Sequence, residues 1–307
     1  MYKSNINLNL YKTFYEVAKS GSISAASKRM YVSQPATSKA IKKLEEELNI
    51  KLFYRNLNGM ELTEKGKDLL FYIEDAFNSL LIGERNVCED DSFSTGRLSI
   101  GVPSHIGRFF IFDKIEEFHS LYPNIEISII SRSTNEILNL LLNHEIDFAI
   151  DSSPIEITHS NMRVVPLEKV RHCFFAIKDS KIKGIEKITS ITDLKDIPLV
   201  LPVTRSYHRK ELNKLAIEYD CEFKNTLSIE TSEMIITATG RDIGIGYVIR
   251  DLIKEEIKNG IYKEIKIKEE LPKVEINIVY IDKYLTKVPR KYIEEFMKIQ
   301  YKKKENK

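Results

Sequence analysis

Residues 23–66 constrain the fold of this 307-residue chain more than any other stretch. Small residues, among them Ala25 and Ser27, predict a short helix that a second helix can cross closely. A break follows at residues 31–32, and Ser33 then offers a side-chain oxygen that can cap a new helix. Pro35 falls in the first turn of that helix, where its missing N–H breaks no hydrogen bond. The stretch therefore predicts two helices, a tight turn between them and a two-stranded wing.

The second of these helices has two different faces. One is apolar at helical spacing, with Ala36, Ala40, Ile41, Leu44 and Leu48. The other carries hydrogen-bonding and cationic side chains, namely Gln34, Thr37, Ser38, Lys39, Lys42 and Lys43. Short polar side chains at a helix N-terminus can reach base edges in a DNA major groove, while lysines neutralise phosphates. The helix therefore has the pattern of a DNA-recognition helix.

The formal net charge of +2 is unevenly distributed. Residues 1–67 carry twelve Lys and Arg against six acids, which leaves +6 in this part of the chain. A basic head on a nearly neutral body is typical of nucleic-acid binding. An ordinary lysine-rich surface would give a similar count, so the charge supports the helix pattern and does not replace it.

The order of motifs over residues 25–66 resembles the winged helix-turn-helix of the LysR-type transcriptional regulators. The matching pieces are AASKRMYVSQPATSKAIKKLEEEL, the wing strand KLFYR and the segment LTEKG. The resemblance implies a DNA-binding transcription factor with a winged helix-turn-helix domain at 1–66, a linker and dimerisation helix at 67–93, and an effector-binding domain at 94–307. The residues that we expect to meet promoter DNA are Ser33, Gln34, Pro35, Thr37, Ser38, Lys39, Lys42 and Arg55, with Gln34, Ser38 and Lys39 at base edges.

Residues 67–91 predict one long amphipathic helix. Its broad apolar stripe consists of Leu69, Leu70, Tyr72, Ile73, Phe77, Leu80 and Leu81. Such a stripe suits a helix–helix seam between two subunits, although packing within the same subunit would also use it. The resemblance implies an antiparallel linker-helix dimer, and a homotetramer if the effector domains pair further.

After an acidic, turn-prone segment at residues 89–96, strands and helices alternate. This order predicts a mostly parallel sheet covered by helices. The pieces GRLSIGVPSHIGRFF and TATGRDIGIGYV resemble the periplasmic-binding-protein-like (type 2) effector domain of the same family. We expect two α/β lobes, one formed by about 96–165 and 273–301 and the other by about 166–272. The fold class is thus α/β behind an all-α winged head.

Ligands of such sheets bind beyond the carboxyl ends of the strands. Loops at those ends nominate an effector site made of hydroxyl, imidazole and guanidinium groups. Helix N-termini with nearby Arg favour a small anion such as a carboxylate. Plain N-capping is the alternative for each hydroxyl, and an inward-pointing Asp151 would instead favour an amine-bearing effector. The candidate residues are Ser104, His105, Ser131, Arg132, Ser133, Asp151, Thr204, Arg205, Thr231 and Ser232.

Other functions lack support in the sequence. No nucleophile elbow, zinc-protease helix or phosphate-binding glycine loop is present, and the six histidines are scattered without metal-ligand spacing. We therefore expect no enzyme activity, no metal site and no cofactor. Three distant cysteines, Cys88, Cys173 and Cys221, are interpreted as reduced thiols.

The chain shows neither a membrane-length apolar run nor a signal-peptide pattern, which predicts a cytoplasmic protein. RNA polymerase is a further candidate partner. The alternative function is a stand-alone small-solute-binding module with a degenerate DNA-binding head.

Overall fold

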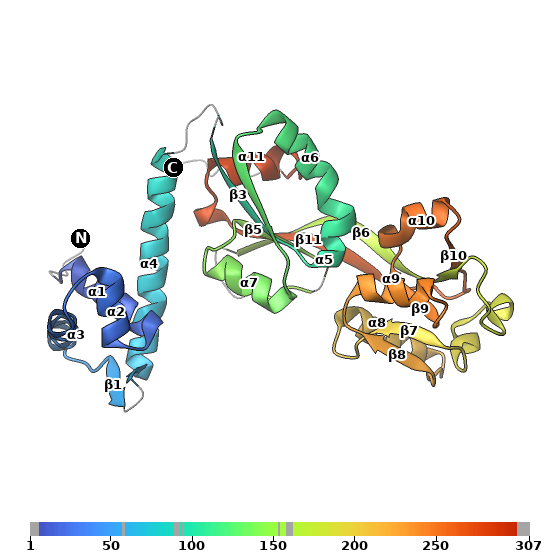
Figure 1. Cartoon of the computed structure of the whole chain (residues 1–307), viewed down its shortest axis with the longest axis horizontal. Coiled ribbons are helices and arrows are strands. Elements are labelled where there is room, and N and C mark those ends of the chain that lie inside the picture. The colour runs from blue at the N-terminus through green and yellow to red at the C-terminus, as the bar shows by residue number, and fades with distance from the viewer. Residues whose placement is uncertain are drawn as a thin grey trace. The chain divides into compact units, whose positions relative to one another are not determined.

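A computed structural model describes residues 6–56, 59–88, 93, 95–152, 154–157 and 162–299. The chain divides into two compact units, Met1–Val87 and Cys88–Lys307, which are described one at a time (Figure 1). No helix among the described residues is long and apolar enough to cross a membrane.

The first unit is a helical head with a small wing. Its helices are α1 (Leu8–Ser20), α2 (Ile23–Met30) and α3 (Gln34–Leu48), and its wing pairs β1 (Phe53–Asn56) with β2 (Gly59–Leu62) in antiparallel register. Ser33 caps α3 by accepting a hydrogen bond from the N–H of Ala36, as expected. Asn49 ends α3 in the left-handed conformation with φ 54°, a conformation that Asn tolerates. The winged helix-turn-helix prediction is confirmed; residues 57 and 58 of the wing tip lie outside the described residues.

A buried carboxylate joins α3 to the wing. Glu45, 9% exposed, accepts hydrogen bonds from the backbone N–H groups of Leu52 (2.8 Å) and Phe53 (3.2 Å) and forms an ion pair with Lys51 (2.9 Å). Burial alone would raise the pKa of Glu45, but these donors hold it below its ordinary value.

The long helix α4 (Glu64–Cys88) uses its apolar stripe in two ways. Leu69, Leu70, Ile73 and Phe77 pack into the core of the head, where the ring of Phe77 meets that of Tyr15 edge to face. Tyr72, Leu80 and Leu81 remain 51–69% exposed. The expectation that the whole stripe forms a subunit seam was therefore too broad, because the head itself covers about half of it.

The second unit begins with a lobe built on three parallel strands. Strand β3 (Gly96–Gly101) pairs in parallel with β4 (Ile125–Ile130) on one side and with β5 (Phe148–Asp151) on the other. Helices α6 (Phe112–Leu121) and α11 (Lys287–Glu295) cover one face of this sheet and α7 (Thr134–Leu142) covers the other (Figure 1). A Cβ atom at Gly101 would lie 2.8 Å from Ile137 of α7, so this close packing requires glycine.

Two long antiparallel strands continue from the first lobe into the second (Figure 1). Strand β6 (Met162–Ile177) pairs with β11 (Lys273–Ile281) from Met162 to Arg171. The register shifts once, between Ile276, which lies opposite Glu168, and Asn277, which lies opposite Pro166. The sequence predicted both strands, but it predicted a mostly parallel sheet. The observed strand order is β4-β3-β5-β11-β6-β9-β7-β8, in which β11 and β6 are antiparallel to their neighbours.

The second lobe repeats the parallel pattern around β7 (Leu199–Pro202). This strand lies between β8 (Thr226–Ile229) and β9 (Ile245–Ile249), and β10 (Tyr262–Ile265) pairs with the outer part of β6. Its helices are α8 (Tyr207–Glu218), α9 (Ser232–Gly240) and the short α10 (Lys254–Lys258), with 3-10 turns at Ile185–Lys187, Ile191–Leu194 and Arg250–Ile253. A further 3-10 turn, Asp282–Tyr284, follows β11 in the first lobe.

Two predicted helices differ in their bounds. The helix expected at 106–122 starts at Ser104, as α5 (Ser104–Ile106), and passes through a π-helical turn (Gly107–Ile111) before α6. The closing helix expected at 289–301 begins two residues earlier, at Lys287, and ends at Glu295, with Pro289 inside its first turn. Residues 300–307, including the basic end of the chain, lie outside the described residues.

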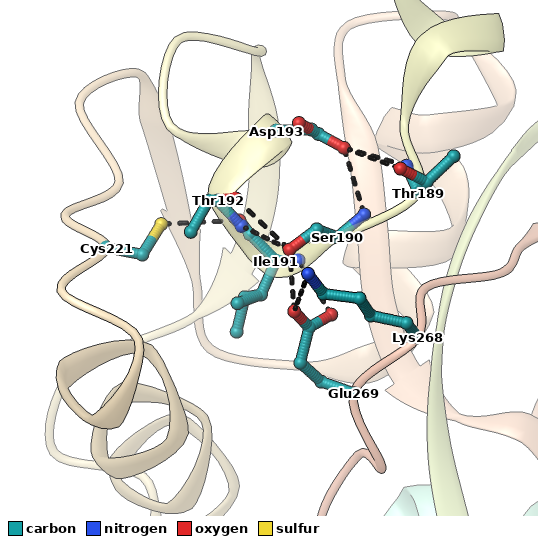
Figure 2. A network of polar contacts seen from close by, with 8 residues as sticks. All are labelled: Thr189, Ser190, Ile191, Thr192, Asp193, Cys221, Lys268 and Glu269. Carbon is teal, nitrogen blue, oxygen red and sulfur yellow. Dashed lines mark hydrogen bonds and ion pairs between the residues drawn. The ribbon is translucent and has the colours of Figure 1, made fainter.

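A polar network closes the outer end of the second lobe (Figure 2). Glu269, 6% exposed, accepts hydrogen bonds from the hydroxyl of Ser190 (2.6 Å) and the N–H of Ile191 (2.9 Å). Asp193 accepts from the N–H groups of Thr189 and Ser190, and the thiol of Cys221 donates to the carbonyl of Ile191. The network therefore fastens residues 189–193 to a segment almost eighty residues away.

Replacing Glu269 with Gln should lower the free energy of unfolding at pH 7 by about 1–3 kcal/mol, because buried charge-assisted hydrogen bonds are lost. The pKa of Glu269 lies below its ordinary value of 4.5, since the donors outweigh burial. Its stabilisation is then present above pH 4.5 and lost as the pH falls through the lowered folded-state pKa. Urea unfolding followed by circular dichroism should show the largest deficit at pH 7 and a smaller one at pH 3.

The matched control is Glu270→Gln, at the exposed neighbour that forms an ion pair with Lys273. At pH 7 this change should alter the unfolding free energy by less than about 0.5 kcal/mol. Equal effects of the two substitutions would contradict the role assigned to Glu269.

Candidate nucleic-acid interface and effector site

The N-terminal end of α3 presents an exposed polar surface. Ser33, Gln34 and Pro35 are all exposed, and the side-chain amide of Gln34 donates to the hydroxyl of Ser24 on α2 at 3.1 Å. This contact holds the Gln34 side-chain amide at the exposed start of the helix. The arrangement presents donors and acceptors beyond the helix end, as base-edge recognition requires.

Thr37 does not lie on this surface. It is 1% exposed, and its hydroxyl is 2.8 Å from that of Ser27, which is itself 3% exposed. The buried pair joins α2 to α3 where the two helices cross, because buried hydroxyl groups need partners. The prediction that Thr37 meets DNA was therefore wrong, and the residue belongs to the helix crossing.

Cations flank the exposed face of α3. The guanidinium of Arg55, on strand β1, donates to the hydroxyl of Ser38 at 2.9 Å, which brings the wing against the recognition helix. Lys42 lies 3.5 Å from Glu46, an exposed pair of the kind that stabilises little, and Lys39 is exposed. Ser38, Lys39, Lys42 and Arg55 thus lie on or beside one face, where Arg55 donates a hydrogen bond to Ser38.

Most of the hydroxyl groups proposed for effector binding begin helices. Ser133 and Glu136 form a capping box at the start of α7, and Thr231 caps α9. The structure therefore favours the capping alternative for Ser133 and Thr231. Ser206, which sequence reasoning missed, caps α8. The helix-start residues Ser104 and Ser232 and the loop residues Ser131 and Thr204 are exposed or half-buried.

The charged candidates are engaged elsewhere. Asp151 is 2% exposed, and its carboxylate accepts hydrogen bonds from the hydroxyl of Thr134 (2.6 Å) and the N–H of Ser152 (2.6 Å). It therefore ties the end of β5 to the start of α7. Arg205 is 76% exposed and forms an ion pair with Glu230, and Arg132 donates to the carbonyl of Ser131. In this structure both guanidinium groups thus have protein partners.

A histidine cluster joins the two lobes. His105, at the start of the first lobe, lies 3.4 Å from the hydroxyl of Ser152 and contacts the ring of His208, on α8, edge to face with centroids 5.5 Å apart. His208 Nδ1 lies 3.1 Å from His172 Nε2 on β6. The sequence pointed to His105 alone, because His172 and His208 come together only through the fold.

Burial keeps these three imidazoles neutral. It lowers the pKa of His105 to about 4 and those of His172 and His208 to about 3, and each ring further lowers the pKa of a neighbouring one. His172 is 1% exposed, stacks on Tyr247 at 4.7 Å and has its Nδ1 3.0 Å from the carbonyl of Pro272. At pH 7 the cluster therefore offers hydrogen-bonding nitrogens and no positive charge.

The described residues give little support for a metal site or for a reactive thiol. Within the described ranges, no group of three or more His, Cys, Asp or Glu side chains is arranged to hold a metal ion. Cys88 is exposed, whereas Cys173 and Cys221 are buried, and all three are free thiols. Burial raises the pKa of Cys173 to about 12, which leaves it protonated and unreactive.

Comparison with known proteins identifies both parts of the chain. Residues 8–67 match the model of the bacterial regulatory helix-turn-helix proteins of the lysR family, and residues 92–297 match the LysR substrate binding domain. The HTH-type transcriptional regulator TdcA of Escherichia coli (strain K12) is 29% identical over 199 residues, which are 65% of this chain and 63% of that relative. The alignment therefore spans less than two thirds of TdcA.

Solved structures share the fold at low sequence identity. A full-length OxyR variant from Pseudomonas aeruginosa superposes with a TM-score of 0.69 at 18% identity, covering 97% of this chain and 96% of that one. Full-length CbnR in complex with its target DNA gives 0.55 at 18% identity, covering 95% and 99%. The family models account for the winged head and for most of the two-lobed unit, and the chain therefore belongs to the LysR family of bacterial regulatory proteins.

Proposed function

We propose that this protein is a DNA-binding transcription factor that reads promoter DNA with the N-terminal end of α3. The observation that carries the proposal is the exposed polar end of α3 beside Lys39, Lys42 and Arg55. Lysines spaced along one helix face match the phosphate positions on either side of a groove. CbnR, whose structure contains its target DNA, has the same fold. No enzyme activity is part of the proposal, and its place of action is the cytoplasm.

We further propose the division of labour that the sequence suggests: a DNA-binding domain at 1–66, a linker helix at 67–93 and an effector domain at 94–307. The effector is a small anion, most simply a carboxylate. It binds where the loops after β3 and β5 meet the start of α8. Contacts connect Thr134, Asp151, Ser152, His105 and His208 there in an unbroken series across both lobes. The alternative, a solute-binding module with a degenerate head, leaves the exposed polar face of α3 without a role.

The dimer is proposed to form through α4. Tyr72, Ala76, Leu80, Gly83 and Val87 are all exposed and recur at spacings of three and four, so they lie on one face of the helix. A Cβ atom at Gly83 would meet nothing within 4 Å, which leaves this face open to a second copy of the helix. Two heads on one rigid pair would read two half-sites at a fixed spacing. Pairing of effector domains would give a tetramer, and RNA polymerase is a further candidate partner.

The regulator function is tested by fluorescence anisotropy of the full-length protein on the DNA upstream of its own gene, with scrambled DNA as the control, over a salt series. Tight, sequence-selective binding that weakens steeply with salt is expected. If upstream DNA shows no preference over scrambled DNA, genome-wide selection of bound fragments follows. Failure to enrich any sequence would refute the proposal.

Gln34→Ala and Lys42→Ala should separate base contacts from phosphate contacts. Removing Gln34 should cost about 1–3 kcal/mol on the preferred sequence and little on scrambled DNA. Removing Lys42 should weaken both similarly and reduce the salt slope by about one. Parallel anisotropy titrations on both DNAs measure this. Equal losses on both DNAs for both variants would remove the base-contact assignment of Gln34.

Leu80→Glu should dissociate the dimer, because it places a charge in the middle of the proposed seam. Leu81→Glu is the matched control: Leu81 is 51% exposed against 57% for Leu80, but it lies about 100° further round α4. Sedimentation equilibrium should find monomers for the first variant and dimers for the second. Dimers in both would exclude this face as the seam.

A further inference from the structure

The histidine cluster forms a directed chain of hydrogen bonds. The carbonyl oxygen of Pro272 can only accept, so His172 Nδ1, 3.0 Å away, must carry the proton. In the neutral ring His172 Nε2 is then a lone pair. His208 Nδ1, 3.1 Å from it, must therefore be the donor. The remaining nitrogen, His208 Nε2, is left as a lone pair on a partly exposed side chain.

In the described part of the chain, the groups packed around His208 carry no permanent charge that could balance an anion. From α5, the ring of His105 faces His208, and from β6 comes His172, on which Tyr247 of β9 stacks. On α8 itself, the ring of Tyr207 lies against His208. The guanidinium of Arg209 turns away, donating to Asn213 (2.8 Å) and to the carbonyl of Pro202 (3.3 Å).

The other charged and titratable groups nearby act elsewhere. Glu211, one turn further along α8, pairs with Lys214, and Cys173 beside His172 stays protonated. Asp151 is held by Thr134 and Ser152. Among the described residues, the cluster thus presents neutral rings to a bound anion.

We propose that the carboxylate effector binds at His208 Nε2 and that each molecule binds together with one proton taken from solvent. The proton is added to His208 Nε2, which becomes the donor to the carboxylate, while His208 Nδ1 continues to donate to His172. No covalent bond forms or breaks in this step. The inference rests on the proposed anionic effector. It adds that proton uptake by His208 supplies the positive charge that holds the anion in a site without a fixed cation.

Two features of the chain favour this protonated state once an anion is present. A carboxylate within hydrogen-bonding distance stabilises the imidazolium and so raises the pKa of His208. The charge is then shared along His172 to the carbonyl of Pro272, because every donor in the chain already points toward an acceptor. The first turn of the twelve-residue helix α8 adds a positive field.

The consequence is a defined dependence of affinity on pH. His208 is neutral in the free protein above a pKa of about 3 and protonated in the complex below its raised pKa. Between these two values one proton accompanies each ligand, so the dissociation constant falls about tenfold for each unit by which the pH is lowered. Above the raised pKa the site binds weakly and without pH dependence.

Full-length protein labelled with ¹⁵N-histidine is titrated with sodium acetate, the probe, between pH 5.5 and 7.5, with sodium chloride as the anion control. Acetate should bind about 100-fold more tightly at pH 5.5 than at pH 7.5 if the slope of one holds throughout. The ¹⁵N shifts should report His172 and His208 as Nδ1–H tautomers without acetate and His208 as an imidazolium with it.

Acetate binding whose affinity does not change with pH, or that leaves His208 neutral, would overturn the proton-linked site and leave the anionic effector in place. Absence of acetate binding at every pH would overturn both. The DNA-binding function is untouched by either result, because anisotropy on promoter DNA tests it separately.

His208→Gln keeps a side-chain N–H donor that cannot titrate. It should abolish the pH dependence, with acetate affinities at pH 5.5 and 7.5 within about twofold. His119→Gln, at an exposed histidine of α6, is the matched control and should retain the slope of the unmodified protein. A pH slope that survives in His208→Gln would place the proton elsewhere. The wild-type slope remains decisive if that variant does not fold.

Discussion

The antiparallel pairing of β6 with β11 is the interaction on which the two-lobed unit depends. β11 lies between β5 and β6, so its inner residues are buried, and both lobes extend from the ladder that it forms with β6. Because β6 and β11 are long, the hydrogen bonds between them join the strands of both lobes into one continuous sheet. Each lobe has its own covering helices. His105 on α5 and His208 on α8 are far apart in the sequence and come together only because this ladder joins the two lobes.

Patterns with a period were predictable from the sequence. The helix pair, its cap at Ser33, the left-handed end at Asn49 and almost every strand follow from local capping, spacing and apolar runs. The sequence could not show that Thr37 is buried while other polar residues of α3 are exposed. A hydroxyl group can serve either at a buried helix crossing or in a DNA groove. The partners of Glu45 and Asp151 were not predictable either, because Leu52 and Thr134 come near these carboxylates only after folding.

The effector site shows the same limit more strongly. Hydroxyls at strand ends were easy to nominate, but the structure uses Ser133 and Thr231 as caps and pairs Arg205 with Glu230. Nothing in the sequence marks His172 as functional, because a single histidine inside an apolar strand is indistinguishable from an ordinary buried core residue. Its importance comes from the backbone carbonyl of Pro272, one hundred residues away, and from the ring of His208 on α8, thirty-six residues away.

The carboxylate of Glu45 has a consequence for the thermodynamics of association. By receiving two wing amides and Lys51, it fixes the angle between α3 and β1 during folding. The conformational entropy of residues 51–53, which enter the wing, is therefore lost on folding and does not subtract from the free energy of complex formation. A head held in this way does not adjust the entry of its wing to fit a mismatched partner surface. A mismatch therefore reduces the binding free energy, and this difference gives the head its selectivity.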